Sequence, residues 1–361
     1  MHDEAATGGG QTLDMSVARV RASPTVGIAG VGGVASFAHV PAYRQLGFPV
    51  ALIYDTDPSA LDICRRALGT DGAETVSVTD EQEFLDLAPS LDMLDIAIPS
   101  HLHGDFLRLL FDKLGRRCPA LLVQKPLADA STAAQLVDRA EALGVRMAVN
   151  LTARWVPPFA KLRELALAGV AGDGVAVSIT NRGFNPKDGK GWRSQLTQLI
   201  ILEMSIHHID LIVWIYGLPL TVYAVLQHVP DQGVFGENVA HILMVYDNGL
   251  KVSITEDWTC RDPIAARYHP AGEEIVVSGS RATLVATPHQ LRVTTAEGTE
   301  RYSSPHDWFP EAFAGPASEF AAALHEGRDT PLSARQHVDV LRVIEACYRS
   351  AESNRVIDVS R

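Results

Sequence analysis

The sequence lacks several features that mark other classes of protein. Its 361 residues include only four cysteines, which lie far apart and form no C-x-x-C pair. This usage is typical of reduced thiols rather than of a disulfide framework or a zinc site. No apolar run reaches the roughly 18 residues that a transmembrane helix needs. The formal net charge of −12 argues against nucleic acid or an anionic membrane as the main partner. We expect a cytoplasmic protein.

The composition is that of a globular protein with a separate N-terminal tail. Residues 1–23 contain a glycine triplet and lack the apolar segment of a signal peptide, so we expect a flexible tail outside the fold. Hydrophobic residues make up 47% of the chain and charged residues 20%, which is ordinary for a folded enzyme. The chain is long for one core, and this predicts two domains.

Residues 24–150 alternate short β-rich runs with amphipathic helical stretches. The runs are nearly continuous apolar strings, as is typical of parallel strands covered on both faces. The predicted strands are Thr25–Ala29, Val50–Tyr54, Met93–Ile98, Leu121–Val123 and Val145–Val149. Asp57 with Pro58 is typical of a helix start, and Ser131 is predicted to open another helix. The predicted fold class is α/β, with a doubly wound parallel sheet in this first domain.

Residues 151–361 predict a second domain in which strands follow one another with little helix between them. The predicted helices are Phe159–Leu167, Ile200–Tyr216, Ala317–Leu324 and Ala334–Ala351. The predicted strands are Val175–Thr180, Val222–Leu226, Ala240–Tyr246, Leu250–Thr255, Glu274–Val277, Thr283–Ala286 and Gln290–Thr294. This order favours an α+β domain on an open, mostly antiparallel sheet. The uncovered face of that sheet favours a homodimer or homotetramer, and the last helices can pack back on the first domain.

A glycine-rich turn follows the first predicted strand. Its sequence is Gly30-Val31-Gly32-Gly33-Val34-Ala35, a G-x-G-x-x-A pattern that opens a predicted helix. The first glycine permits a tight turn, the second lets the backbone approach a pyrophosphate, and the small Ala35 lets helix and strand pack closely. The helix N-terminus adds partial positive charge. In this context the pattern predicts a Rossmann dinucleotide site, although glycine-rich turns also occur without a ligand.

Asp55 ends the second predicted strand, where an acidic residue commonly binds the adenosine ribose. A carboxylate there accepts hydrogen bonds from ribose hydroxyls and repels a 2′-phosphate. No Arg or Lys occurs between Thr56 and Ile63 to neutralise such a phosphate. The sequence therefore favours NAD over NADP. Asp57, two residues later, is a competing carboxylate that is predicted to cap a helix.

Three further motifs carry candidate chemistry. Pro99, Ser100 and His103 follow one predicted parallel strand, and Gln124-Lys125-Pro126 follows the next. Ligands bind at the carboxyl ends of such strands. In the apolar stretch 200–216, Glu203 and His207 are four residues apart and share a face if the stretch is helical. His208 points about 100° away on a helix, which argues against a metal site built from these side chains.

In combination, these motifs resemble the Gfo/Idh/MocA oxidoreductases, the family of glucose–fructose oxidoreductase and inositol dehydrogenase. The resemblance begins near Thr25 and extends to the C-terminus. It rests on the glycine turn, the P-x-x-x-H turn, the Lys-Pro dipeptide, the Trp192-Arg193 pair and the acid-x-x-x-His-x-x-Asp segment that ends at Asp210. The closing segment RVIEACYRSAESNRVIDV is also similar to the family's C-terminus.

The resemblance implies roles for residues of both domains. Lys125 would reach the nicotinamide and the substrate hydroxyl, His207 would take the hydroxyl proton, and Glu203 would be the acidic residue beside it. This chemistry is reasonable, because histidine titrates near neutral pH and an ammonium stabilises developing alkoxide charge. Further cofactor contacts are expected from Pro99, Ser100, His103 and Gln124. Substrate contacts are expected from Arg154, Trp192, Arg193 and His208.

The sequence departs from the family pattern at three places. Gln124 replaces the usual Glu before the lysine, and Glu203 replaces the usual Asp. Gln198–Ile201 replaces a common glycine-rich stretch. These departures bear on the substrate and on the role of Glu203 more than on the reaction class.

Several alternatives stay open from the sequence. Lys125 could be a solvated charge, His207 a hydrogen-bonded core histidine, and the tryptophans packing residues. The expected function is NAD-linked hydride transfer at a secondary alcohol carbon of a sugar, sugar acid, polyol or glycoside. Redox-neutral chemistry through transient oxidation is an alternative, and a non-catalytic dinucleotide sensor or subunit is another.

Overall fold

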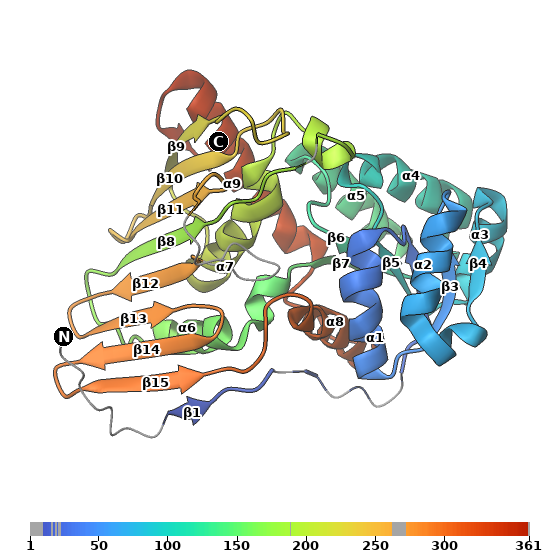
Figure 1. Ribbon diagram of the computed structural model, residues 1–361, viewed down its shortest axis with the longest axis horizontal. Coiled ribbons are helices and arrows are strands. Elements are labelled where there is room, and N and C mark those ends of the chain that lie inside the picture. The colour runs from blue at the N-terminus through green and yellow to red at the C-terminus, as the bar shows by residue number, and fades with distance from the viewer. Residues whose placement is uncertain are drawn as a thin grey trace. The chain divides into compact units, whose positions relative to one another are not determined.

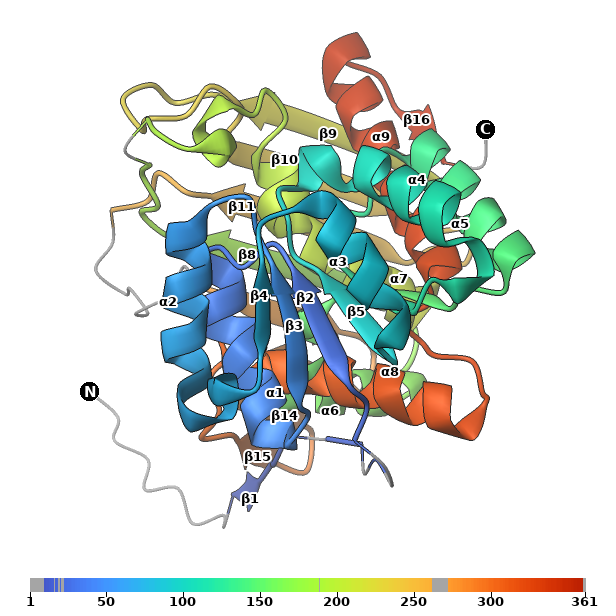
Figure 2. The same cartoon turned by 90° about the vertical axis from the view of Figure 1, so that its right-hand side faces the viewer.

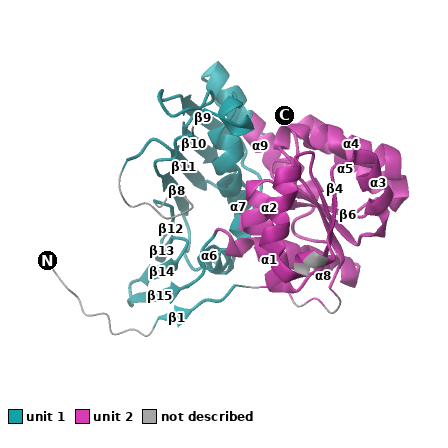
Figure 3. Ribbon diagram, turned by 45° about the vertical axis from the view of Figure 1, so that its right-hand side comes forward, with its two compact units in different colours: residues 1–15, 153–308, 346–361 teal, residues 16–152, 309–345 magenta. Residues whose placement is uncertain are grey.

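The computed structural model describes residues 10–15, 17–18, 20, 23–187, 189–261 and 272–359, and these form two compact units (Figure 3). Unit 2 contains residues 16–152 and 309–345. Unit 1 contains residues 1–15, 153–308 and 346–361. The division after residue 152 lies close to the predicted boundary. The second predicted domain, 151–361, is interrupted, because residues 309–345 belong to unit 2.

Unit 2 is built on a six-stranded sheet with the order β4-β3-β2-β5-β6-β7, in which every neighbouring pair is parallel. Its strands are β2 Val26–Ala29, β3 Val50–Tyr54, β4 Val76–Val78, β5 Met93–Ile96, β6 Ala120–Gln124 and β7 Met147–Asn150. This is the predicted doubly wound sheet. β4 was not predicted, since its three residues run from exposed to buried and provide no apolar string.

Helices cover both faces of this sheet, and Figure 2 shows α1 and α2 on one face and α3, α4 and α5 on the other. The helices are α1 Val40–Leu46, α2 Pro58–Leu68, α3 Glu81–Leu87, α4 His103–Leu114, α5 Ala130–Leu143 and α8 Ala314–Glu326. Asp57 caps α2 by accepting a hydrogen bond from the Ser59 backbone at 2.9 Å, as predicted. α5 begins one residue before Ser131, because Asp129 is its capping residue. α8 contacts α1, β6 and β7, so this late helix packs in unit 2.

Unit 1 is built on a ten-stranded sheet with the order β1-β15-β14-β13-β12-β8-β11-β10-β9-β16 (Figure 1). Its long strands are β8 Ala176–Arg182, β9 Thr221–Gln227, β10 Val239–Val245, β11 Lys251–Asp257, β12 Glu274–Ser278, β13 Ala282–Ala286, β14 Gln290–Thr295 and β15 Thr299–Ser303. Most pairs are antiparallel, as predicted, but β8 and β11 are parallel neighbours. β15 was not predicted, since only one of its five residues is buried.

The two edge strands of this sheet come from the chain termini. β1 Gln11–Thr12 pairs in parallel with Tyr302–Ser303, and β16 Ile357–Asp358 pairs with β9. The prediction of a flexible tail over residues 1–23 is therefore wrong for β1. Residues 1–9 of that tail lie outside the described residues.

The helices of unit 1 pack on one face of the sheet. α6 Pro157–Leu167 contacts β13 and β14. The predicted helix 200–216 has two parts, a π-helix at Ile201–Ser205 and α7 Ile206–Tyr216. α9 Ala334–Ser353 begins in unit 2 and ends in unit 1. Among the helices that the structure describes, none combines the length and apolar character needed to cross a membrane.

Candidate active site

The glycine turn of unit 2 packs closely against the sheet on one side and is open on the other. Gly30 has φ +85°, and a Cβ at this position would lie 2.4 Å from the backbone nitrogen of Ile98. Only glycine fits there without moving backbone atoms. A Cβ on Gly32 or Gly33 would meet no atom within 4 Å, so the outer side of the turn is open. Val34 is half-buried, and Ala35 is buried where the following π-helix, Ala35–His39, begins.

Asp55 lies beside this turn and is tied to it. Its Oδ2 accepts a hydrogen bond from the Val31 backbone at 2.9 Å, and its Oδ1 accepts one from the Asp57 backbone at 2.9 Å. Each carboxylate oxygen has a second lone pair, so both can still accept from ribose hydroxyls. Asp57 caps α2 instead, which separates the roles of the two carboxylates.

A cavity of about 350 Å³ opens at Asp55, along the carboxyl ends of β2, β3 and β5. Its lining includes Gly30, Asp55, Pro99, Leu102 and Phe106. An open backbone turn, a carboxylate and apolar side chains fit the pyrophosphate, ribose and base of a dinucleotide, respectively. Leu102 and Phe106 were not among the predicted site residues. Their only signal in the sequence is that both are apolar and follow Pro99, with Leu102 just before α4 and Phe106 in its first turn.

His103 occupies a different role from the one predicted. Its ring is buried, with Nδ1 2.8 Å from the Pro126 carbonyl oxygen and Nε2 3.0 Å from the Ile98 carbonyl oxygen. Burial lowers the pKa of His103 and favours the neutral ring. Both ring nitrogens face backbone carbonyls, so neither is available to a cofactor. We correct the predicted cofactor contact: His103 joins the turn after β5 to the turn after β6.

Lys125 lies in the second of these turns. It directly follows β6, it is half-buried, and its peptide bond to Pro126 is cis. Its backbone nitrogen donates to Oε1 of Gln124 at 3.3 Å. β6 is next to β5 in the parallel sheet, and β5 is next to β2. Lys125, Ser100 and the glycine turn therefore lie along the same edge of one sheet.

In unit 1, His208 forms a buried group of three ionisable side chains with Glu256 and Glu273. Its Nδ1 is 2.6 Å from Glu256 Oε1, and its Nε2 is 2.6 Å from Glu273 Oε1. Burial alone would lower the pKa of His208, but the two carboxylates outweigh burial and raise it to about 10. Burial raises the pKa of Glu273, and His208 partly offsets that shift. The predicted role of His208 in substrate binding is wrong, because both nitrogens are occupied and the ring is fully buried.

His207, the residue before His208, is the second residue of α7 and lies beside this group. Its relative exposure is 9%, and its ring lies edge-on to Trp308 with the centroids 5.4 Å apart. The same tryptophan ring lies 6.3 Å from the His208 ring. The bonds from His208 to Glu256 on β11 and to Glu273 before β12 hold this end of α7 on the sheet. The backbone around His207 is thereby fixed.

Glu203, which lies one helical turn before His207, forms an ion pair with Arg193. Arg193 donates from Nε to Glu203 Oε2 at 2.9 Å, and its guanidinium lies 4.5 Å from the ring centroid of Trp192. Glu203 is in the π-helix, so its spacing from His207 differs from that of the predicted α-helix. Three of the predicted residues, Trp192, Arg193 and Glu203, are brought together here.

Arg154 is bound to Asp210 rather than presented to a ligand. Its Nε donates to Asp210 Oδ2 at 2.8 Å and its Nη2 to Oδ1 at 2.6 Å, and both residues are buried. The guanidinium also lies 5.2 Å from the ring centroid of Trp214. A bidentate, buried pair of this kind fixes the orientation of the guanidinium and keeps it inside the protein. We therefore correct the predicted substrate contact of Arg154 to a structural one.

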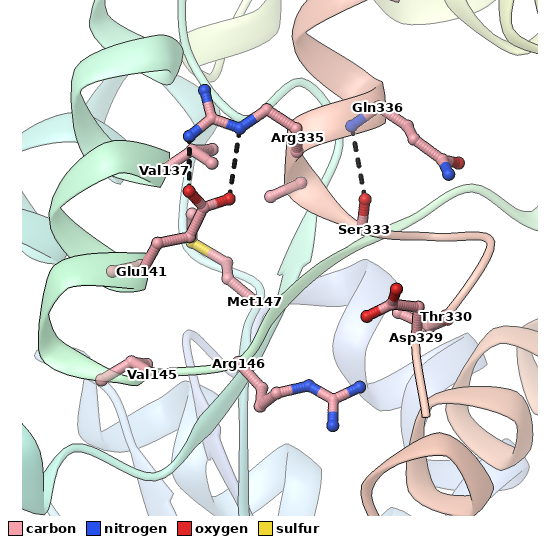
Figure 4. A pocket seen from close by; sticks show the side chains of 12 residues that line it. Val137, Glu141, Val145, Arg146, Met147, Asp329, Thr330, Ser333, Arg335 and Gln336 are labelled. Atoms are coloured by element: carbon pink, nitrogen blue, oxygen red, sulfur yellow. Dashed lines mark hydrogen bonds and ion pairs between the residues drawn. The ribbon is translucent and has the colours of Figure 1, made fainter. Parts of the chain in front are cut away.

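A second pocket of unit 2, also about 350 Å³, lies at the amino end of β7, the sheet edge opposite the glycine turn (Figure 4). Figure 4 shows Arg335 facing Glu141, with Nη2 2.7 Å from Glu141 Oε2. Arg335 also binds Asp138, and Arg146 donates to the carbonyl of Arg328. The arginines that line this pocket therefore bind groups of the protein itself, and we assign the pocket no ligand.

The two halves of the chain match known protein families. Residues 25–151 match the family described as "Oxidoreductase family, NAD-binding Rossmann fold", and residues 159–285 match "GFO/IDH/MocA C-terminal domain". D-apiose dehydrogenase from Paraburkholderia graminis is 23% identical over 337 residues, which cover 89% of this chain and 86% of that protein. D-xylose 1-dehydrogenase (NADP(+)) 2 from Haloferax volcanii is 25% identical over 344 residues, covering 92% of this chain and 99% of the relative.

Solved structures share the fold. A crystal structure of an oxidoreductase from Agrobacterium radiobacter, in complex with NAD+, L-tartaric acid and magnesium, superposes with a TM-score of 0.81 at 21% identity. The superposition covers 94% of this chain and 99% of that one. The two-part architecture of this chain is therefore shared with an oxidoreductase over nearly its full length.

Proposed function

Because this chain belongs to the Gfo/Idh/MocA family of oxidoreductases, we propose that it transfers a hydride between NAD and a secondary alcohol carbon of a carbohydrate. The proposed substrate is a sugar, sugar acid, polyol or glycoside. The observation that carries the proposal is the shared sheet edge of unit 2, where the open glycine turn, Asp55 and Lys125 follow neighbouring parallel strands. The named dehydrogenase relatives support the substrate class.

We propose that Asp55 makes NAD the preferred cofactor. The glycine turn would hold the pyrophosphate, and Asp55 would accept hydrogen bonds from the adenosine ribose. Asp55→Asn keeps an oxygen that can accept from the Val31 backbone but removes the charge that opposes a 2′-phosphate. Loss of a charge-assisted bond of about 1.5–3 kcal/mol predicts a ten- to hundredfold fall in the NAD over NADP ratio of kcat/KM. Asp57→Ser is the matched control, since serine can still cap α2.

Lys125 and His207 are the proposed catalytic pair. NAD, when bound, accepts the hydride from the alcohol carbon. Oxidation also requires the hydroxyl proton to leave, and we assign its removal to the His207 imidazole. The Lys125 ammonium would donate a hydrogen bond to the same oxygen and stabilise its developing negative charge. Glu203, held by Arg193, is proposed to tune His207 from one turn earlier.

The experiment that tests this function is a substrate screen followed by two variants. Sugars, sugar acids, inositols and glycosides are offered with saturating NAD, and NADH absorbance is followed. Lys125→Met and His207→Ala should each lower kcat by about 10²–10⁴ while NAD affinity changes little. Lys113→Met, at an exposed lysine near the end of α4, is the matched control. Wild-type turnover in either catalytic variant would remove that residue from the mechanism.

We further propose that the chain forms a homodimer or homotetramer through the open face of the large sheet. On that face Val225 and Leu243 are 47% and 42% exposed, and Leu243 pairs with Tyr223 across β9 and β10. Contiguous exposed apolar side chains on a sheet face are typical of an interface. Leu243→Glu should shift the sedimentation coefficient towards that of a monomer. A dilute, fully active wild-type monomer would contradict this proposal.

A further inference from the structure

Unit 1 contains a half-buried lysine that has no acidic partner among the described residues. The Lys187 ammonium donates to Asn185 Oδ1 at 2.8 Å and lies 5.4 Å from the ring centroid of Trp258. In the described ranges, no carboxylate is close enough to form an ion pair with it. Burial lowers the pKa of Lys187, Arg193 lowers it further, and Glu203 partly offsets both. The charged form of a partly desolvated ammonium is strongly stabilised when an anion binds beside it.

Arg193 is the second cation of the group. Segment 232–235 contacts the segments of both cations, because its first carbonyl accepts from the Lys187 backbone N–H at 2.8 Å and its last N–H donates to the Ser194 carbonyl at 3.1 Å. The Nε of Arg193 is bound to Glu203, and the arginine side chain is 40% exposed. Among the described residues, neither terminal nitrogen of its guanidinium has a hydrogen-bond partner. The face of the ring of Trp192 supports the guanidinium, which restricts its orientation. The free edge of Arg193 therefore presents two parallel N–H donors, the geometry that matches a carboxylate.

The charge balance favours a singly charged anion. Among the described side chains of this group, Lys187 and Arg193 contribute two positive charges and Glu203 contributes one negative charge, so these three carry a net charge of about +1. A carboxylate would neutralise it. A phosphate ester, with a charge of about −2, would leave an excess of negative charge in a half-buried place. A neutral hydroxyl would leave the Lys187 ammonium uncompensated.

The group lies beside the proposed base. Glu203 comes one turn before His207, and His208 binds Glu256 on β11. Trp258 directly follows β11, two residues after Glu256, and its side chain is buried. Asn185 donates its backbone N–H to the Trp258 carbonyl at 3.0 Å, which ties the segment that carries Lys187 to the end of β11.

We propose that Lys187 and Arg193 form a carboxylate-binding subsite, so that the substrate is an acidic carbohydrate such as a uronate or an aldonate. The inference rests on the proposed function and narrows its substrate class. Arg193 binds the carboxylate through its two terminal N–H groups, and Lys187 adds a compact positive charge. The alcohol carbon then loses its hydride to NAD and its hydroxyl proton to His207, giving a keto acid and NADH.

Two measurements on the full-length protein with NAD test this subsite. The first is kcat/KM for uronates and aldonates, for the corresponding neutral hexoses and methyl esters, and for hexose phosphates. The second is binding of the same compounds, followed through the intrinsic tryptophan fluorescence of the protein and by calorimetry. We expect acids to be preferred over methyl esters by about ten- to hundredfold, the range of one charge-assisted hydrogen bond.

Variants separate the subsite from general damage. Lys187→Met should lower affinity and kcat/KM for acids by a similar factor, mainly through KM, and leave NAD affinity and the values for methyl esters unchanged. Lys190→Met, at an exposed lysine three residues later, is the matched control and should change neither. Arg193→Lys should recover part of the loss seen in Arg193→Met, because the charge is kept and the fork is lost.

The outcomes distinguish the subsite from the proposed function. Equal use of acids and neutral sugars, with no effect of Lys187→Met, would overturn the subsite and leave the dehydrogenase function intact. A preference for hexose phosphates would overturn it as well. Acid binding that depends on Lys187, without NADH formation from any compound, would support the subsite and contradict the function. Absence of carboxylate-selective binding in the calorimeter would overturn the subsite whatever the turnover.

Discussion

The buried group of His208, Glu256 and Glu273 makes the stability of unit 1 depend on pH in a defined direction. Two carboxylates at 2.6 Å face the two nitrogens of one imidazole. A neutral imidazole has a single N–H, so a proton beyond it is needed to satisfy both contacts. His208→Gln removes the titrating group and keeps an amide that can donate to one carboxylate.

The size of the effect follows from the pKa of His208. The folded value is raised from 6.5 to about 10, so this histidine contributes stability that is complete below its ordinary pKa and is lost as pH rises towards the folded value. Between about pH 7 and pH 10 the loss is on the order of 3–4 kcal/mol, at about 1.4 kcal/mol for each unit. The raised pKa of Glu273 also makes the free energy of unfolding fall as pH rises, because the folded state binds this proton more tightly than the unfolded state does.

The assay is urea unfolding of wild type and variants at several pH values in this window. The free energy of unfolding of wild type should fall towards that of His208→Gln as pH rises, so the difference between them should shrink by the amount given above. His241→Gln, at an exposed histidine on β10, is the matched control and should keep a constant difference from wild type. If the difference for His208→Gln is the same at every pH, His208 does not carry the buried charge, and our reasoning is refuted. If His208→Gln does not fold, the slope of wild type alone decides.

Three further predictions concern unit 2. Gly30→Ala should lower the free energy of unfolding by more than about 1 kcal/mol in a denaturant titration, because φ is +85° and the new Cβ would meet backbone. Gly32→Ala should change the free energy of unfolding by less than about 0.5 kcal/mol and weaken NAD binding in calorimetry, because its Cβ would enter the open side of the turn. Asp57→Ala should cost about 1 kcal/mol in thermal unfolding by removing the α2 cap, with NAD affinity kept. His103→Ala should lower kcat more than NAD affinity, since it frees the turn that carries Lys125; equal losses in both would contradict the positioning role.

Much of the fold could be predicted because local patterns and tertiary structure agree. β3 begins and ends at the predicted residues, and α2 begins at Pro58 after its predicted cap residue Asp57. Elements with few buried residues were missed. β4 and β15 have little apolar pattern, and β1 is two residues long, so their strand geometry depends on neighbours that are distant in sequence.

The site could be predicted in part. The sequence located Asp55 beside the glycine turn, since a short motif places both, but it did not predict the ion pair of Glu203 with Arg193. It predicted that His208 and His103 bind ligands, whereas in the structure their ring nitrogens contact oxygen atoms of the protein itself. Their partners come from other elements, up to 65 residues away for the second glutamate of His208. Spacing along a helix identifies which side chains share a face, but it cannot identify the acceptors that a distant strand provides.

The proposed mechanism depends on one arrangement: Lys125 of unit 2 and His207 of unit 1 acting on the same substrate oxygen. A crystal structure of the protein with NAD tests this directly, through the separation of Lys125 Nζ from the nearer ring nitrogen of His207. If both bind one oxygen at about 3 Å, the two nitrogens must lie within about 6 Å of each other and on the same side of the nicotinamide ring. A separation beyond about 10 Å, or positions on opposite faces of the ring, would contradict the mechanism.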